Sequence, residues 1–119
     1  HVLVVEDNLL NQQVAQELLN AEGALVELAA NGQLGIDAIA KTPRPFDVVL
    51  MDLQMPIMDG YTATHIIRHG MGLTSLPIIA MTANAMASDR EACLAAGMNA
   101  HLVKPLLTEQ LYEALLQWL

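Results

Sequence analysis

The 119-residue chain carries thirteen aspartate and glutamate residues against five lysine and arginine residues, a formal net charge of −8. This charge argues against nucleic acid and anionic membrane surfaces as direct ligands, because both require a basic face. No apolar run approaches the roughly 20 residues that a membrane-spanning helix needs, and a single cysteine cannot form an internal disulfide. We therefore expect one cytoplasmic domain without membrane insertion. Its core should be aliphatic, since hydrophobic residues make up 54% of the chain and aromatic residues only 3%.

The first elements are a strand and an amphipathic helix. Residues 2–5 form a short, wholly apolar, β-branched run, which is typical of a strand covered on both faces. Leu10, Val14 and Leu18 then recur every fourth residue, as on one face of a helix, and Gly23 supplies a stop. The chain therefore begins with a strand followed by a helix, and we expect strands and helices to alternate in the rest of the sequence.

The same alternation continues to the end of the sequence. Further strands are predicted at 24–30, 47–51, 78–81 and 100–103, with Asn31 and Gly32 as a turn; further helices are predicted around 36–40, 60–69, 84–96 and from Thr108 onward. Five strand–helix units of this size predict a parallel sheet with helices on both faces. The chain is too short for an eight-stranded barrel, so an open, doubly wound α/β sheet is expected.

Polar side chains follow four of these strands at the point where each strand ends. Glu6 and Asp7 follow the first strand, Asp52 the third, Thr82 the fourth and Lys104 the fifth. Right-handed crossovers place the carboxyl ends of all strands on one rim, where ligands of such sheets bind. Any one of these residues alone is more simply a turn residue, a helix cap or a surface charge; the coincidence of all five indicates a site.

The chemistry of this set favours a divalent cation and a phosphoryl group. Three carboxylates close together raise one another's pKa unless a cation lies among them, and Mg²⁺ is the hard ion that such oxygen ligands suit. Glu6, Asp7, Asp52 and the backbone carbonyl of Gln54 are the predicted ligands. Asp52, on the central strand, is the predicted nucleophile that forms an acyl phosphate, and Thr82 and Lys104 would hold phosphoryl oxygens.

At four stretches the sequence resembles the receiver domain of two-component response regulators. They are LVVEDN (3–8), DVVLMDLQMPIMDG (47–60), PIIAMTANA (77–85) and GMNAHLVKP (97–105), and the resemblance covers the whole chain. It implies a flavodoxin-like (βα)5 fold with strand order 2-1-3-4-5. It also implies Mg²⁺-dependent phosphorylation of Asp52 from a phosphohistidine on a histidine kinase or a histidine phosphotransfer domain, with Thr82 as the switch hydroxyl and Lys104 as the family's lysine. The domain would promote its own phosphorylation and dephosphorylation.

The resemblance carries further expectations. The peptide before Pro105 is usually cis in this family. The segments MDLQMPIMDG and MTANA, with Asn8 and Asn11, look most like receivers of hybrid sensor histidine kinases. Residues 1–119 would then be a single receiver domain excised from a larger protein, on the cytoplasmic side of a membrane-bound sensor. The responding surface would comprise the fourth helix, fifth strand and fifth helix, and a homodimer is conceivable.

One departure from the family concerns the switch residue. The position three residues before Lys104 usually holds Tyr or Phe, and here it holds His101. The aromatic rotation that accompanies the Thr82 movement is therefore open for this chain, and a pH-sensitive response near 6.5 is a hypothesis. The phosphorylation chemistry does not depend on this position.

Other functions and sites fit the sequence less well. An Asp-nucleophile phosphatase needs a second acid where Gln54 stands, and a nucleotide site needs a Gly-rich or Ser/Thr-rich cradle. A phosphorylation-independent interaction module is the alternative on the same fold. His65 and His69 lack a third ligand in view and are expected to be surface residues, and Cys93 is expected to be buried. Leu9 and Leu10, beside the acids, could contact a partner helix or pack in the core.

Overall fold

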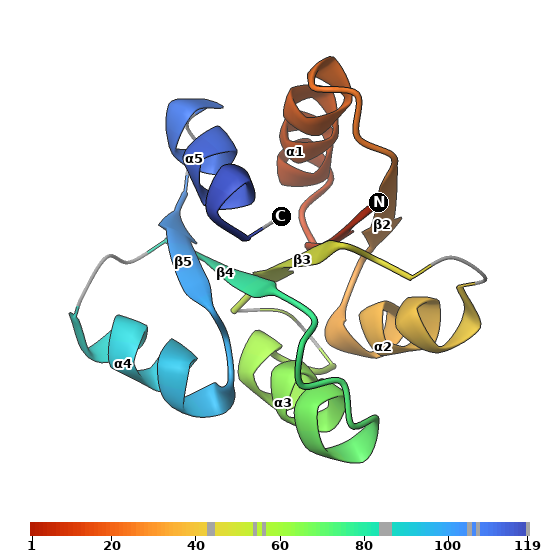
Figure 1. The fold of residues 1–119 in the computed structure, drawn as a ribbon, viewed down its shortest axis with the longest axis vertical. Coiled ribbons are helices and arrows are strands. Elements are labelled where there is room, and N and C mark those ends of the chain that lie inside the picture. Colours follow the sequence, from red (N-terminus) through yellow and green to blue (C-terminus); the bar gives the residue numbers. More distant parts are fainter. Residues whose placement is uncertain are drawn as a thin grey trace.

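The computed structural model describes residues 1–42, 45–53, 55, 57–83, 87–104, 106 and 108–118, with the backbone alone at 87–89. The strands are β1 Val2–Val5, β2 Val26–Ala29, β3 Val48–Asp52, β4 Ile78–Thr82 and β5 Ala100–Val103. The helices are α1 Leu9–Ala21, α2 Gly32–Lys41, α3 Gly60–His65 with a π-helical continuation Ile66–Gly70 (η1), α4 Ala87–Ala96 and α5 Thr108–Trp118. Within the described residues, five strands form one parallel sheet in the order β2-β1-β3-β4-β5, which confirms the predicted fold (Figure 1).

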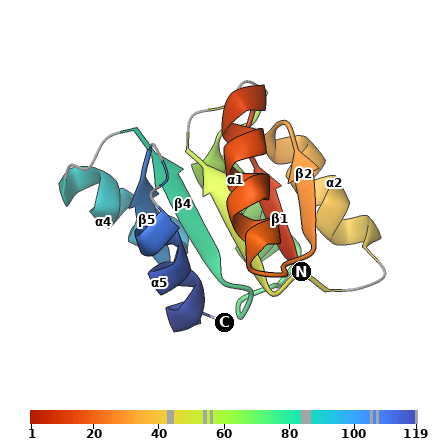
Figure 2. The same ribbon diagram turned by 90° about the horizontal axis from the view of Figure 1, so that it is seen from above.

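Helices cover both faces of the sheet, with α1 and α5 on one face and α2, α3 and α4 on the other (Figures 1 and 2). The central strand β3 shows how the sequence produces this sandwich. Val48 and Leu50 pack in the cluster that includes residues of α1 and α5, whereas Val49 and Met51 pack in the cluster that includes residues of α2, α3 and α4. Alternate side chains of a strand point to opposite faces, so an unbroken apolar run fits a strand that is covered twice.

Several boundaries differ from the sequence-based expectations. β2 is shorter than the predicted 24–30. Asn31 does not form a free turn but caps α2, because its side chain accepts a hydrogen bond from Leu34 N at 2.9 Å. The predicted helix 60–69 ends in the π-helix η1, where Met71 N donates to Ile66 O five residues earlier, at 2.9 Å. Residues 84–86 of the predicted fourth helix lie outside the described residues.

The helix stop at Gly23 agrees with the prediction, and Gly97 ends α4 in the same way. These glycines follow α1 and α4 with φ of +82° and +102°, a backbone region that glycine adopts without steric cost. Among the described residues, no helix combines the length and apolar character needed to span a bilayer.

Candidate functional site

The five residues predicted from strand ends lie together at the carboxyl edge of the sheet. Glu6, Asp7, Asp52, Thr82 and Lys104 line one cavity of about 200 Å³. Each is placed by the end of a strand: β1 leads into the two acids, β3 and β4 end on Asp52 and Thr82, and the lysine follows β5. The sequence-based set is therefore one structural site.

A shared ammonium group organises the buried part of this site. Lys104 Nζ lies 2.8 Å from Glu6 Oε2 and 3.0 Å from Asp52 Oδ2. Glu6 and Asp52 are only 1% and 3% exposed, so both carboxylates depend on this partner for charge compensation. Lys104 follows β5, and its ammonium thereby links Glu6, just after β1, with Asp52 at the end of β3.

The electrostatics of the pair follow from burial and bonding. Burial alone raises the pKa of Glu6, but the ion pair with Lys104 and hydrogen bonds from Asn11 and Asn8 outweigh it and hold that pKa below its ordinary value. For Lys104, burial lowers the pKa, and the carboxylates of Glu6 and Asp52 outweigh it and raise that pKa. Both groups therefore stay charged at neutral pH.

The residues present fit a hard divalent cation. Carboxylate oxygens of Glu6, Asp7 and Asp52 all lie within 4.8 Å of one another, and Asp7 is exposed to solvent. Three carboxylates and one ammonium leave this site with a charge of −2 before any ion binds. An all-oxygen donor set that opens to water is the kind of site that Mg²⁺ occupies while keeping part of its hydration shell.

The backbone around Asp52 is held closely by the start of α3. A Cβ atom on Gly60 would lie 2.4 Å from the carbonyl oxygen of Asp52, so only glycine permits this approach. Asp59, in the loop between β3 and α3, is not part of the site. Its side chain accepts a hydrogen bond from Thr62 N at 2.8 Å and caps α3. On the opposite side of the site, Lys104 N donates to Thr82 O at 2.7 Å, which fixes the lysine next to β4.

Hydrogen-bond donors of α1 are a part of the site that the sequence alone did not reveal. Asn8 N and Asn11 Nδ2 each donate to Glu6 Oε1 at 3.2 Å, and Gln12 Nε2 donates to the Glu6 carbonyl at 2.6 Å. One feature of the sequence could have indicated these contacts, namely the predicted start of a helix just after the two acids. Asn8 is a residue type that often caps a helix, and side chains three and four residues after the cap lie on the same side of the helix as the cap.

The remaining residues singled out in the sequence either lie apart from the acids or are not among the described residues. Gln54 and Pro105 are outside the described residues. His101 is half-buried on β5 and lines a separate pocket between α4 and α5 with Leu94 and Trp118. Cys93 is buried as expected.

The two helix histidines are exposed, as the sequence predicted. The rings of His65 and His69 lie 4.5 Å apart, measured between their centroids. Within the described part of the chain, the acid cluster is the only group of three or more His, Cys, Asp or Glu residues that could hold a metal. The histidines therefore have no third ligand among these residues.

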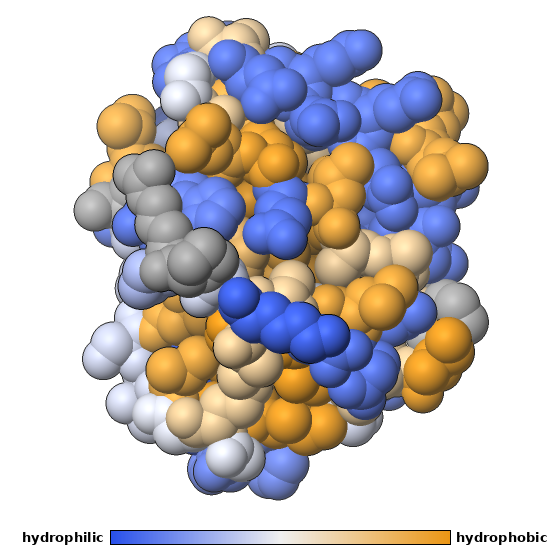
Figure 3. Space-filling model, turned by 90° about the vertical axis from the view of Figure 1, so that its right-hand side faces the viewer, coloured by the Kyte–Doolittle hydropathy of each residue, from blue (hydrophilic) through white to orange (hydrophobic). Residues whose placement is uncertain are grey.

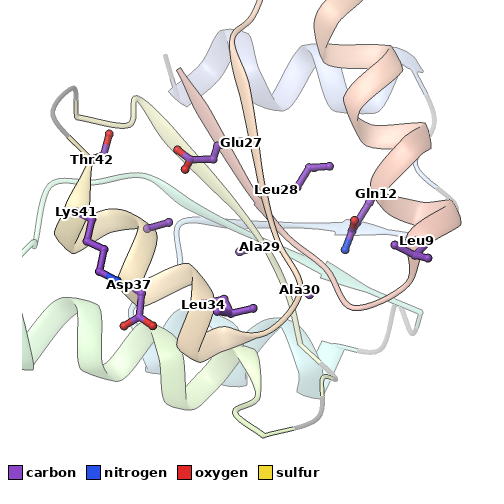
Figure 4. Close-up of a pocket in the computed structure, with 11 residues that line it drawn as sticks. Leu9, Gln12, Glu27, Leu28, Ala29, Ala30, Leu34, Asp37, Lys41 and Thr42 are labelled. Carbon is purple, nitrogen blue, oxygen red and sulfur yellow. The ribbon is translucent and has the colours of Figure 1, made fainter.

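The side of the molecule near β2 carries a groove that is distinct from the acid site. Figure 3 shows apolar patches separated by hydrophilic residues on this side. The groove runs between α1 and α2 along β2, and its lining includes Leu9, Gln12, Leu28 and Leu34 (Figure 4). None of the five strand-end residues lines it.

Comparisons with known proteins agree with this geometry. The model of the response regulator receiver domain family matches residues 2–116. Hybrid signal transduction histidine kinase M of Dictyostelium discoideum is 44% identical over 108 residues; the match covers 88% of this chain, which spans 4% of that relative's length. The predicted resemblance to receivers of hybrid kinases is thus confirmed.

Two solved structures are also similar. The receiver domain of sensor histidine kinase PA1611 from Pseudomonas aeruginosa, solved with a magnesium ion coordinated in its active-site cleft, is 42% identical with a TM-score of 0.88 over 98% of this chain and 94% of that one. The receiver domain of Ssk1 from Saccharomyces cerevisiae, solved with the histidine phosphotransfer protein Ypd1, is 28% identical with a TM-score of 0.90 over 98% of this chain and 86% of that one. The chain belongs to the receiver domain family of two-component response regulators.

Proposed function

We propose that Asp52 is the phosphoacceptor of this receiver domain and takes a phosphoryl group from a phosphohistidine in a Mg²⁺-dependent reaction. The observation that carries the proposal is the position of its carboxylate, 3.0 Å from Lys104 Nζ and within 4.8 Å of carboxylate oxygens of Glu6 and Asp7. A carboxylate that ends a buried strand beside a cation and two further acids has the geometry of a nucleophile at a metal site.

The transfer needs no added base. A carboxylate oxygen of Asp52 forms the new P–O bond, and the P–N bond of the phosphohistidine breaks, with the leaving imidazole taking a proton from water. The nucleophile reacts as the anion, so no proton has to be removed from it. When bound, Mg²⁺ would neutralise charge on the phosphoryl oxygens.

Each neighbouring residue has a proposed role in this reaction. Asp7, Asp52 and the backbone carbonyl of Gln54 would hold Mg²⁺ directly, and Glu6 would act through water because its two oxygens already face Lys104 and the donors of α1. Lys104 is positioned to transfer its pairing from Asp52 to a phosphoryl oxygen.

Phosphorylation would be signalled through Thr82. The hydroxyl of Thr82, at the end of β4, would donate to a phosphoryl oxygen, and His101 on the neighbouring strand β5 would respond, with α4, β5 and α5 as the output surface.

The proposed donor is the phosphohistidine of a histidine kinase or of a phosphotransfer protein. Exposed apolar side chains follow the acids along the chain. Leu9 and Leu10, at the start of α1 just after Asp7, are 74% and 67% exposed, and Ile57, in the loop after β3, is 83% exposed. Exposed apolar residues in the segments that follow β1 and β3 suit a partner helix that presents its histidine to Asp52. The Ssk1 receiver, which was solved with Ypd1, supports this class of partner.

The similarity to hybrid kinases supports a larger parent protein. We infer that the chain is the receiver of a hybrid sensor kinase and lies on the cytoplasmic side of the membrane. Sedimentation of the isolated chain tests whether it forms a homodimer. The interaction-module alternative is not favoured, because Asp52, both acids of the β1 loop and Lys104 are all present and assembled.

The experiment is intact mass after incubation with acetyl phosphate, with and without Mg²⁺. We expect one phosphate adduct that requires Mg²⁺ and is lost in Asp52→Asn. Asp59→Asn is the matched control, since it changes an acid of the same loop that only caps α3, and it should keep the adduct. An adduct that persists in Asp52→Asn would overturn the assignment.

A further inference from the structure

The carboxylate of Glu6 is held on both of its oxygens although it is almost completely buried. Oε2 faces the ammonium of Lys104 at 2.8 Å, and Oε1 accepts from Asn8 N and Asn11 Nδ2, both at 3.2 Å. An ion pair on one oxygen and two hydrogen-bond donors on the other fix the orientation of this carboxylate, because rotation about its last side-chain bonds would break several of these contacts together.

The first turn of α1 also holds the backbone of the same residue. Gln12 Nε2 donates to the Glu6 carbonyl at 2.6 Å, and Gln12 is only 8% exposed. This carbonyl belongs to the peptide that joins Glu6 to Asp7, so Gln12 fixes the point from which the exposed second acid projects. Asn11 therefore fixes the side chain of Glu6, and Gln12 fixes the backbone that leads to Asp7.

These contacts are separate from the cap that stabilises the helix. Asn8 caps α1 through its side-chain oxygen, which accepts from the backbone N–H of Asn11 at 3.1 Å. The side-chain amide of Asn11 is directed to Glu6 instead. Replacing Asn11 by alanine would leave the capping bond in place and would favour the helix, since alanine has the higher helix propensity.

We propose that Asn11 and Gln12 are positioning residues that set the Mg²⁺ affinity of the acid site by fixing Glu6 and the start of Asp7. The inference rests on the proposed function, because it assigns the acids to a metal. Groups that orient metal-binding carboxylates without touching the metal typically change affinity 10- to 100-fold when they are removed. Glu6 also anchors Lys104, so its orientation decides how that ammonium is shared with Asp52.

Calorimetric titration of the metal-free protein with MgCl₂ tests the proposal without any phosphorylation step. We expect Asn11→Ala to raise the Mg²⁺ dissociation constant about tenfold, and Gln12→Met, which keeps the volume but removes the donor, to raise it to a similar extent. Asn20→Ala is the matched control, because Asn20 is an exposed residue in the last turn of the same helix. It should bind Mg²⁺ as the wild type does.

A double-mutant cycle separates positioning from a general effect on the fold. If Asn11 acts through Glu6, Asn11→Ala should change the Mg²⁺ dissociation constant less than twofold in a Glu6→Gln background. Wild-type affinity in Asn11→Ala, or a full tenfold effect that persists beside Glu6→Gln, would overturn the positioning role. Absence of Mg²⁺ binding by the wild type would instead overturn the metal part of the proposed function, so the two failures are distinguishable.

Discussion

At the scale of single residues, Glu6 is a buried charge held by several partners. It is 1% exposed and yet ionised, because Lys104, Asn11 and Asn8 together compensate the cost of removing a carboxylate from water. A buried charge with this many partners contributes to stability only while it remains ionised. Its titration should therefore be visible in the unfolding of the metal-free protein.

The direction of that pH dependence follows from the lowered pKa. The folded-state pKa of Glu6 lies below its ordinary value of 4.5, so its contribution is fully present above about pH 4.5 and is lost as the pH falls through the folded-state value. We expect urea unfolding of the metal-free protein to show this loss, and Glu6→Gln to reduce the slope of stability against pH below 4.5. Glu17→Gln, an exposed acid of α1, is the control; an equal reduction in both variants would contradict the account.

At the scale of elements, the close packing of α3 against the end of β3 depends on one glycine. Gly60 leaves no room for a side chain, since a Cβ would lie 2.4 Å from Asp52 O and 3.0 Å from Leu53 Cα. The first atom belongs to the last residue of β3, the proposed phosphoacceptor, and the second belongs to the residue that follows it. A side chain at this position would have to displace the helix or the strand end.

We therefore expect Gly60→Ala to lower the free energy of unfolding by about 1–3 kcal/mol, the usual cost of overpacking. It should also slow phosphorylation by acetyl phosphate, because Asp52 shifts with its backbone. Gly70→Ala is the matched control: its added Cβ would meet Ile66 Cγ2 at an ordinary 3.5 Å. Equal stability of the two variants in urea would show that the contact with β3 is not limiting.

The sequence predicted elements and strand ends well, and side-chain contacts less well, for physical reasons. Asp52, Thr82 and Lys104 could be placed together because right-handed crossovers bring all carboxyl ends of a parallel sheet to one rim. The donation from Asn11 to Glu6 could not be predicted, since it depends on the angle at which α1 leaves the β1 loop and on a side-chain rotamer. The π-helix η1 was not predicted either, because apolar spacing over five residues does not distinguish i→i+5 from i→i+4 hydrogen bonding. The contacts of its buried Arg68, which donates to Gly97 O and Leu73 O, join segments far apart in the sequence and could not be predicted for the same reason as the contact of Asn11.

At the scale of the whole molecule, the sheet gathers negative charge at one edge of an already acidic protein. The net charge is −8, and three of the thirteen acids face one another within 4.8 Å. Their mutual repulsion opposes the folded state, and a cation that binds only the folded state relieves it. Metal binding should therefore be coupled to global stability.

We expect MgCl₂ at about 100 times its dissociation constant to add about 2.7 kcal/mol to the free energy of unfolding. The gain should shrink in Asp52→Asn, which removes one proposed ligand. KCl at the same ionic strength is the control for charge screening, which acts on all surface charges alike. A gain from KCl as large as that from MgCl₂ would mean that screening, rather than a bound ion, stabilises the protein.

The most direct measurement is chemical mapping of the phosphorylated residue. Borohydride reduces an aspartyl phosphate to homoserine, and tandem mass spectrometry of the digested protein then locates the changed position. We predict homoserine at position 52, formed only when phosphodonor and Mg²⁺ were both present. Homoserine at position 7 or 59, or an unmodified Asp52 in a protein that carries phosphate, would contradict this prediction.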